Sequence, residues 1–208
     1  MKNNYSILRV LEYNELEKLK IDGQILDLGG SKKSGYQQLI KGKHKIVTAN
    51  IDKNYDCDLI FDIEKKFPLD SESYDAAVCL NVLEHIFNFQ NVFAETQRVL
   101  KSGSIFIFST PFIYQIHGSP DDFFRYTESA LVRLLKESGF KEIKVIKLNY
   151  GLFSLFFQIV GGAIPTNFLR IAIKNSSIFL DSFLLNISKR YRKLNERVPL
   201  GYIVRAVK

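Results

Sequence analysis

Apolar and polar residues follow two alternating patterns along the chain, one typical of buried strands and one typical of amphipathic helices. Short apolar runs bounded by glycine or polar residues predict strands at residues 24–29, 44–52, 57–63, 74–82 and 104–110. Apolar positions at helical spacing predict helices near residues 6–20, 34–41, 88–100 and 128–140. Two further segments have strand patterns: 141–149, which is half-solvated, and 201–208, which is of the edge type. This alternation predicts a doubly wound, Rossmann-like α/β fold with a mostly parallel sheet of these seven strands.

A long uncharged run and a basic cluster mark the C-terminal part of the chain. Residues 149–169 contain no charged residue, and the following apolar segment 176–193 ends in basic residues. Two glycines and a proline within the run argue against a membrane-crossing helix, which needs ~20 apolar residues. We therefore expect a single domain over residues 1–208 that includes a helical insertion at 150–197. The insertion either covers the sheet as a lid or contacts an anionic membrane surface through residues 170–193.

The net charge of +7 is concentrated in the same part of the chain. Of the 29 basic and 22 acidic residues, 20 of each lie in residues 1–150, so 9 basic and 2 acidic residues remain for 151–208. A basic chain can indicate a nucleic-acid partner. Residues 170–193 lack aromatic side chains at a regular stacking spacing, so we expect no nucleic acid.

The two cysteines and the N-terminal residues indicate in which cellular compartment the protein is expected. Cys57 and Cys79 have no metal-type spacing and indicate reduced thiols in a cytoplasmic protein. Residues 1–20 are interrupted by charges and lack the apolar core of a signal peptide, so we expect none.

The first predicted strand ends in two glycines, and the second ends in an acid. Ligands of open α/β sheets bind at the carboxyl ends of the strands. Gly29 and Gly30 allow a turn whose backbone approaches a ligand closely. Asp52 follows Gly29 by 23 positions, near the ~20-residue offset at which a carboxylate meets ribose hydroxyls. The next glycine is Gly35, which breaks the G-x-G-x-x-G pattern, so the residues indicate a nucleoside ligand without a cradle for a dinucleotide pyrophosphate.

Four segments in order resemble the class I S-adenosylmethionine-dependent methyltransferases of the type 11-like group: ILDLGG, ANID, DLIFDIEKKFPLDSESYDAAVCLNVLEHI and ETQRVLKSGSIFIFSTP. The resemblance covers residues 20–148. The trailing GYIVRAVK resembles the family's antiparallel last strand, which places residues 150–195 in an insertion before it. The resemblance implies S-adenosylmethionine as the cofactor and S-adenosylhomocysteine as its product.

The resemblance also assigns cofactor contacts residue by residue. It places Asp27, Gly29 and Gly30 at the methionine moiety, Asp52 at the ribose, Asp62 and Ile63 at the adenine, and Asn81 and Val82 toward the sulfonium and the substrate. The alternatives are a surface acid for Asp62 and a turn cap for Asn81. One position departs from the family pattern, since Ser31 replaces the usual third glycine and is followed by Lys32 and Lys33.

The chain has three histidines, two of which lie near the predicted strand ends. His44 begins a strand and indicates a surface residue, whereas His85 directly follows the fourth strand. Some quinone-pathway relatives bind a divalent metal here through Glu-x-x-Glu-His, but this chain has Asn81, Glu84 and His85. One carboxylate, one imidazole and one amide make a poor magnesium site, so we expect no metal. The alternative is that Glu84 and His85 form hydrogen bonds across neighbouring loops.

The segment HGSPDDFFRYT, from His117 to Thr127, places reactive and aromatic groups directly after the fifth strand. It resembles a motif found in methyltransferases that accompany surface-polysaccharide synthesis. We expect His117 to act as general base, oriented by Asp121 or Asp122, and Arg125 to hold a phosphate or carboxylate. We expect its aromatic residues, Phe123, Phe124 and Tyr126, to close over the cofactor or stack on a sugar. In the alternative interpretation Asp122 pairs with Arg125, Thr127 caps the next helix and the phenylalanines are core.

These expectations converge on one hypothesis with rivals. The chain is expected to be an S-adenosylmethionine-dependent O-methyltransferase that acts on a sugar hydroxyl of a surface glycan or its nucleotide- or lipid-linked precursor. His117 and His85 are its catalytic candidates, and Asp122, Arg125 and Tyr126 its substrate-binding candidates. The rivals are a small-molecule or quinone-type methyltransferase and an inactive cofactor-binding partner of a glycan-assembly enzyme.

Overall fold

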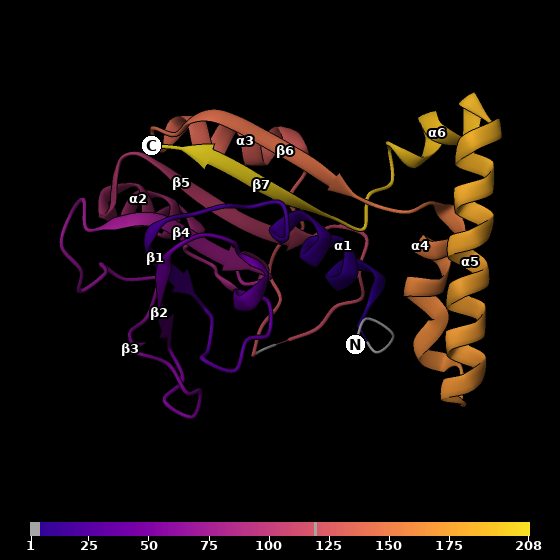
Figure 1. Ribbon diagram of the computed structural model, residues 1–208, viewed down its shortest axis with the longest axis horizontal. Helices are drawn as coiled ribbons and strands as arrows, with labels where there is room; N and C mark the ends of the chain where they lie inside the picture. Colours follow the sequence, from indigo (N-terminus) through magenta and orange to yellow (C-terminus); the bar gives the residue numbers. More distant parts are fainter. Residues whose placement is uncertain (1–4, 119) are drawn as a thin grey trace.

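The computed structural model describes residues 5–118 and 120–208, and all seven strands lie in one sheet (Figure 1). The strand order is β3-β2-β1-β4-β5-β7-β6. Its members are β1 (Gly23–Leu28), β2 (His44–Asn50), β3 (Leu59–Ile60), β4 (Tyr74–Leu80), β5 (Leu100–Pro111), β6 (Lys141–Leu148) and β7 (Gly201–Val207). The first five strands are parallel, and β7 pairs antiparallel with both β5 and β6. The predicted doubly wound, mostly parallel sheet is confirmed.

Helices cover both faces of the sheet because its central strands are apolar on both sides. One core joins the sheet to α2 (Phe89–Val99) and α3 (Glu128–Glu137), through residues such as Phe93, Phe106 and Leu135. The other core joins the opposite face to α1 (Ile7–Leu16), through residues such as Leu8, Ile107 and Ile203. The described residues also form short 3₁₀ turns, namely η2 (Gln37–Leu39), η3 (Leu83–His85) and η4 (Gly161–Ala163).

Two predicted elements differ in the structure. The segment 201–208 is not an edge strand, because β7 lies between β5 and β6 and is buried along most of its length. Its apolar residues pack on both faces of the sheet. The sequence of one strand does not show whether that strand lies inside the sheet or at its edge. The helix predicted at 34–41 is only the turn η2, because Tyr36 and Gln37 turn inward to bind Asp27.

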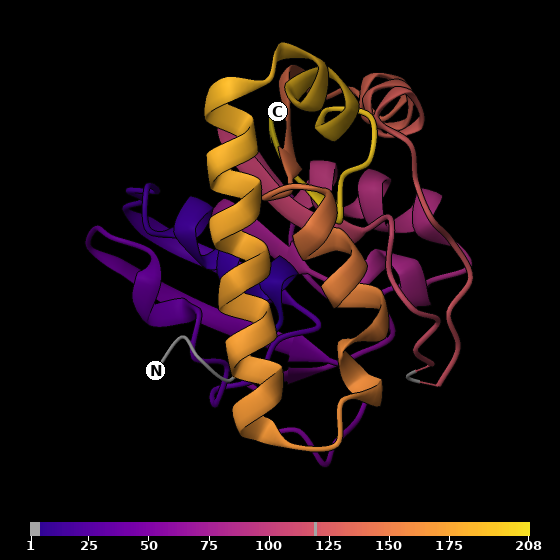
Figure 2. The ribbon, with the colours of Figure 1, turned by 90° about the vertical axis from the view of Figure 1, so that its right-hand side faces the viewer.

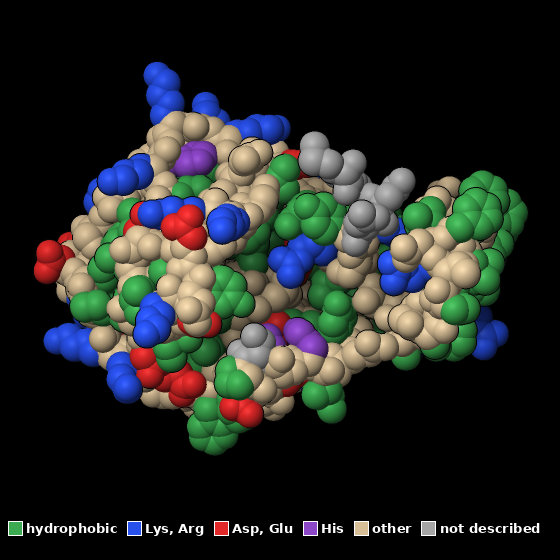
Figure 3. All heavy atoms as spheres, turned by 90° about the horizontal axis from the view of Figure 1, so that it is seen from below, with side chains coloured by type: hydrophobic (Ala, Val, Ile, Leu, Met, Phe, Trp, Pro, Cys, Tyr) green, Lys and Arg blue, Asp and Glu red, His purple; other side chains and the backbone are tan. Residues whose placement is uncertain are grey.

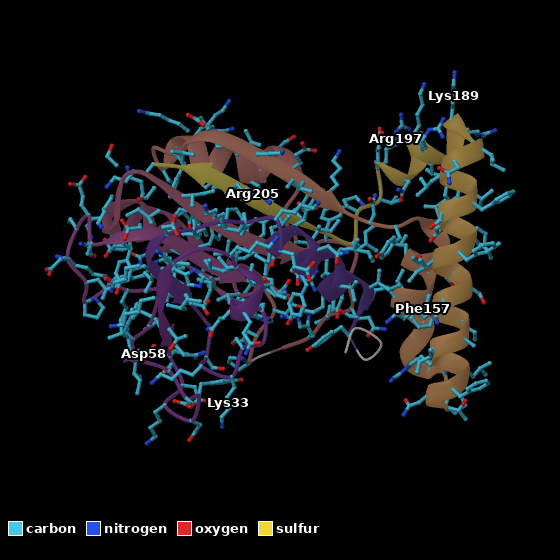
Figure 4. The ribbon with its side chains drawn as sticks, viewed as in Figure 1. Lys33, Asp58, Phe157, Lys189, Arg197 and Arg205 are labelled. Atoms are coloured by element: carbon cyan, nitrogen blue, oxygen red, sulfur yellow. The ribbon has the colours of Figure 1, made fainter. Side chains whose placement is uncertain are left out.

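The residues between β6 and β7 form a helical hairpin at the end of the sheet (Figures 1 and 2). It consists of α4 (Leu152–Val160), α5 (Asn167–Ile187) and the short α6 (Lys189–Asn195). Phe157 anchors α4 to the body, since it is buried in the core that contains α1 (Figure 4). Among the described residues, none of the helices combines the length and apolar character that a membrane crossing requires.

One buried carboxylate holds this hairpin together. Asp181 on α5 accepts hydrogen bonds from the backbone N–H groups of Phe153 (3.0 Å) and Ser154 (2.7 Å), and so caps the first turn of α4. The hydroxyl of Tyr191 on α6 donates to the same carboxylate. At Gly151 a Cβ atom would lie 2.3 Å from the Asp181 carboxyl carbon, so only glycine permits this close approach.

Candidate active site

The loop after β1 is a tight turn that two neighbouring strands hold in place. Gly29 has a φ of +78°, and a Cβ atom there would lie 2.4 Å from Cγ2 of Val82, which follows β4. Asn50 at the end of β2 donates from its side-chain amide to the carbonyl oxygens of Gly29 (3.1 Å) and Gly30 (3.3 Å). The ends of β1, β2 and β4 therefore meet at this turn, as a ligand site at a strand edge requires.

Asp27 is buried beneath this turn and organises it. The Tyr36 hydroxyl donates to both carboxylate oxygens at 2.8 Å, and the Gln37 amide donates to one of them at 2.8 Å. Burial raises the pKa of Asp27 to about 6, against the opposing effect of these hydrogen bonds. A Cβ atom on Gly30 would lie 2.1 Å from the carboxylate, so this position accepts only glycine while Asp27 stays in place. The turn is thus built around a carboxylate as well as around glycine.

The departure at Ser31 is accommodated without a third glycine. The Ser31 N–H donates to the Ser34 hydroxyl at 3.1 Å, and the Ser34 N–H donates to the Ser31 carbonyl at 2.9 Å. Lys32 forms an ion pair with Asp58 at 2.9 Å. Hydrogen bonds from Thr48 and Lys32 lower the pKa of Asp58 to about 2. The loop is therefore closed by polar contacts, and the charge of Lys32 is balanced by Asp58.

The three residues expected around the nucleoside lie along the same edge. Asp52 is half-buried just past β2, and one of its carboxylate oxygens accepts from the Asn54 N–H at 2.8 Å. Asp62 accepts from the Glu64 N–H at 2.9 Å and faces Lys65 at 3.3 Å, so it stabilises a turn. Ile63 is buried in the core that contains α2. Their roles toward a cofactor remain predictions.

The end of β4 carries a strained residue. Asn81 has a φ of +52°, which non-glycine residues adopt rarely and mostly at functional sites. Its side-chain amide nitrogen donates to Glu12 of α1 at 3.0 Å, while its side-chain oxygen is buried without a partner among the described residues. Glu12 is fully buried, which raises its pKa, and its second carboxylate oxygen also has no partner. These two orphaned oxygens can accept hydrogen bonds or face a positive charge.

A small polar cavity of about 100 Å³ opens beside these groups. Its lining includes Arg9 and Glu12 from α1, Asn81 after β4, and Tyr114 and His117 after β5. The sequence reasoning missed Arg9, Glu12 and Tyr114. A signal existed for Glu12, because it lies four residues from Leu8 and from Leu16 on the buried face of α1, where a carboxylate is costly unless it has a use.

The segment after β5 is a loop docked onto the turn η3. The Glu84 carbonyl accepts from the N–H groups of Phe123 (2.7 Å) and Phe124 (3.3 Å), and the Tyr126 hydroxyl donates to the Leu83 carbonyl at 3.2 Å. Phe124 packs against the core, Tyr126 is buried within it, and Phe123 is 43% exposed. Of the three aromatic residues, Phe123 alone keeps the exposed ring that stacking on a ligand requires.

The polar groups of this loop are paired with one another. Arg125 binds both carboxylate oxygens of Asp122 and also donates to the carbonyls of Phe124 and Gln115. These contacts hold the pKa of Asp122 well below its usual range, with the Arg125 hydrogen bond as the main cause. Thr127 caps α3 by accepting from Ala130 at 3.3 Å, as the alternative interpretation of this segment had it. The side chains of Arg125 and Tyr126 are engaged within the protein, and substrate binding by them stays a prediction.

Glu84, His85 and His117 come together where this loop meets η3. The Nε2 atoms of His85 and His117 each lie 3.8 Å from Oε1 of Glu84, and the two rings are 5.0 Å apart. Asp122, rather than Asp121, orients His117: its carboxylate accepts from the His117 backbone N–H at 2.9 Å and lies 3.4 Å from Nδ1. Burial raises the pKa of Glu84 to about 8. The two catalytic candidates are therefore neighbours, joined by a carboxylate that the sequence did not mark as central.

The chain is similar to known proteins in part of its sequence and in its fold. Residues 37–108, about a third of the chain, match the methyltransferase domain family. These residues run from η2 to β5 and include Asp52, Asn81 and His85. No curated protein sequence matches the chain.

Solved structures of methyltransferases share the fold of this chain at low sequence identity. A methyltransferase from Archaeoglobus fulgidus described as SAM-dependent has a TM-score of 0.61 and 15% identity, with 97% of this chain and 92% of that chain covered. A possible histamine N-methyltransferase from Thermotoga maritima has a TM-score of 0.59 and 16% identity, with 99% and 91% covered. Phosphoethanolamine N-methyltransferase 2 from Haemonchus contortus, solved with S-adenosyl-L-methionine, has a TM-score of 0.57 and 16% identity, with 97% and 52% covered. The chain thus spans about half the length of this last structure.

Proposed function

We propose that the protein is a methyltransferase that uses S-adenosylmethionine. The observation that carries this proposal is the match of residues 37–108 to the methyltransferase domain family, because this range contains the ends of β2 and β4 with Asp52 and Asn81, which were expected to bind the cofactor. The neighbour from Haemonchus contortus binds S-adenosyl-L-methionine on the same fold. The residues for this cofactor are the turn at Gly29 and Gly30, Asp52, the Asp62–Ile63 pair, and Asn81 with Val82.

The charge of the site supports a cationic cofactor. S-adenosylmethionine carries a sulfonium and an ammonium group, both of which favour nearby acceptors and carboxylates. One carboxylate oxygen of Glu12 accepts from Asn81 and lies 3.7 Å from Arg9, but the other carboxylate oxygen and the side-chain oxygen of Asn81 have no partner among the described residues. Both residues line the cavity. A buried acceptor without a partner is costly, so these oxygens favour a ligand that brings positive charge or donors. The residues present therefore fit the cofactor.

We further propose that the acceptor is a hydroxyl group, in particular a sugar hydroxyl of a surface glycan or its precursor. The bound cofactor supplies a methyl group for in-line displacement, and the protein has to place the acceptor and remove its proton. The small cavity is lined by polar groups from Arg9, Asn81 and His117, which suits a polyhydroxyl acceptor. The cluster of His117, His85 and Glu84 takes the proton, and Asp122 holds the loop that carries His117.

The helical hairpin supports a second part of this proposal, a peripheral contact with an anionic membrane at its cytoplasmic face. Only Ser177 and Asp181 of α5 are buried, whereas its exposed apolar side chains lie on one face. Five of these are at least 46% exposed: Phe168, Leu169, Phe179, Phe183 and Ile187. Figure 3 shows hydrophobic side chains gathered on the outer end of the hairpin.

The charge of the hairpin selects an anionic surface as the partner of this face. Figure 4 shows Lys189 and Arg197 at the same end of the hairpin. Arg190 and Lys193 belong to α6, which begins at Lys189. Asp181 is the sole acid of α5 and α6, and it is buried. An apolar helix face beside basic residues binds anionic lipid surfaces, and a lipid-linked glycan precursor would be presented there.

Calorimetric titration with S-adenosylhomocysteine tests the methyltransferase proposal. We expect one binding site per chain, with binding lost in Asp52→Ala and kept in Asp56→Ala, an exposed carboxylate near the same turn. The product analogue is the right probe because it needs no acceptor. Absence of binding to the wild-type chain would reject the proposed activity.

Co-sedimentation with vesicles tests the membrane contact. We expect binding to phosphatidylglycerol vesicles but not to phosphatidylcholine vesicles, and loss of binding in the double variant Phe179→Ser, Phe183→Ser. The matched control is Ile60→Ser, which changes an exposed apolar residue on β3, away from the hairpin. If the chain instead forms a dimer that the double variant dissociates, a second copy covers this face and the membrane proposal is rejected.

A further inference from the structure

The cluster of Glu84, His85 and His117 contains three hydrogen-bond acceptors that face one another with no donor between them. His85 places its Nδ1 atom 2.5 Å from the Asp121 carbonyl oxygen, and His117 places its Nδ1 atom 3.2 Å from the Gln115 carbonyl oxygen. A carbonyl oxygen can only accept, so both Nδ1 atoms carry the proton. In the neutral rings, the Nε2 lone pairs therefore point toward the Glu84 carboxylate.

The third acceptor of this cluster is also unsatisfied. Glu84 is fully buried, and neither of its carboxylate oxygens has a hydrogen-bond partner within the described part of the chain. One oxygen lies 3.8 Å from each of the two Nε2 atoms. A buried, unpartnered carboxylate that faces two imidazole lone pairs is unfavourable unless a proton or a metal cation lies between them.

We propose that Glu84, His85 and His117 bind a divalent transition-metal ion, with Zn²⁺ as the representative of this class. One ligand atom from each residue lies within 4.8 Å of the other two. Metal–ligand bonds of ~2.0–2.2 Å bring such atoms to about 3–3.5 Å from one another, so a small inward movement closes the site. Two imidazoles and one carboxylate favour zinc or iron over magnesium, which prefers oxygen ligands.

The surroundings of the two histidines are those of metal ligands. In metal sites the ring nitrogen that is not bound to metal donates to a backbone carbonyl or a carboxylate, which fixes the tautomer. Both histidines make this contact with a backbone carbonyl, and the Asp122 carboxylate lies 3.4 Å from Nδ1 of His117. His117 also lines the small polar cavity, so the ion would keep an open position on the side where an acceptor would enter.

This site changes the expectation drawn from Asn81, Glu84 and His85 alone. The sequence suggested one carboxylate, one imidazole and an amide, which is a poor set for magnesium. The fold instead brings His117 from the loop after β5 and directs the Asn81 amide to Glu12. The catalytic use of the ion rests on the proposed function: a hydroxyl bound to the metal loses its proton more readily, and His117 would then act as a ligand and not as a free base.

Metal titration of the full chain tests the site. After treatment with a chelator, the protein is titrated with Co²⁺ and its visible absorption recorded, and Zn²⁺ binding is measured by equilibrium dialysis. We expect one ion per chain and at least tenfold weaker binding in each of Glu84→Gln, His85→Gln and His117→Gln. His44→Gln is the matched control, because His44 lies at the start of β2 and should leave metal affinity unchanged.

Circular dichroism and S-adenosylhomocysteine binding on the same preparations separate folding and function from metal binding. Stoichiometric Co²⁺ binding that the three variants weaken supports the site even where the nucleoside does not bind. Nucleoside binding without Co²⁺ or Zn²⁺ binding overturns it. Metal binding that survives all three substitutions in folded variants also overturns it.

Discussion

Asp27 makes the stability of the protein depend on pH, and an Asp27→Asn variant should lose this contribution, so that the stability difference between variant and wild type changes sign between low and high pH. Burial raises its pKa from 3.8 to about 6 in the folded state, so the folded chain holds this proton more tightly than the unfolded chain. The resulting stabilisation is fully present below about pH 3.8 and is lost as the pH rises through about 6. A pKa difference of this size corresponds to ~3 kcal/mol of unfolding free energy.

Asparagine removes the ionisation and changes one hydrogen bond. The Tyr36 hydroxyl can still donate to the remaining carbonyl oxygen, but the Gln37 amide, which also donates to the Ser31 carbonyl, would face another donor. Losing that bond costs ~1 kcal/mol. We therefore expect the variant to be less stable than the wild type by ~0.5 kcal/mol near pH 4 and more stable by ~2 kcal/mol near pH 8.

Urea unfolding followed by circular dichroism measures this effect, because the chain has no tryptophan for fluorescence. Asp70→Asn is the control: its side chain is exposed, and we expect its effect to stay within ~0.5 kcal/mol at both pH values. If the difference between Asp27→Asn and wild type had the same sign and size near pH 4 and near pH 8, the assignment of a costly buried charge to Asp27 would be wrong.

Three further substitutions test other contacts. Gly29→Ala places a Cβ atom 2.4 Å from Val82 at a φ of +78°. We expect the unfolding free energy to fall by ~1–3 kcal/mol and calorimetry to show weaker S-adenosylhomocysteine binding. A variant with unchanged stability and binding would contradict the close packing of this turn. Asp181→Ala removes the acceptor for two backbone N–H groups and the Tyr191 hydroxyl. Hydrogen exchange of the α4 amides should therefore be at least tenfold faster, which corresponds to ~1.4 kcal/mol or more. Unchanged exchange in α4 would refute the capping contact. Thr127→Ala removes the α3 cap and should lower the unfolding free energy by ~1 kcal/mol, which urea unfolding would detect; no loss would show that another group caps the helix.

Local patterns predicted most of the fold because each central strand and each amphipathic helix has its own apolar signature. The segment 74–82 is apolar almost throughout, and β4 is the strand that lies at the centre of the sheet. The position of β7 could not be predicted in the same way, since an apolar strand fits an edge or an interior place equally well. Its place follows from antiparallel pairing with two strands that are distant in sequence.

The sequence predicted site residues that directly follow a strand. It predicted less well those side-chain contacts that depend on the conformation of a loop. Asp27, Gly29, Asp52 and Asn81 lie at strand ends, and topology brings these ends together. The partners of Arg125 depend on the fold of an irregular loop with no periodic signal, so its pairing with Asp122 stood only as an alternative to substrate binding. Glu12 enters the site because α1 packs across the end of β4, a long-range contact that no local pattern encodes.

The contacts within the loop after β5 give the site its order before any ligand binds. Backbone N–H groups of Phe123 and Phe124 are fixed on Glu84, and the Arg125–Asp122 pair fixes the backbone of His117. A catalytic or metal-binding group gains from such restraint, because little conformational freedom is then lost on binding. Asp122 and Arg125, which were expected to bind substrate, make contacts within the loop that hold His117 in place. The same segment can therefore be rich in reactive groups while most of them pair within the protein, and the roles of His85, His117 and the exposed ring of Phe123 toward a ligand stay predictions.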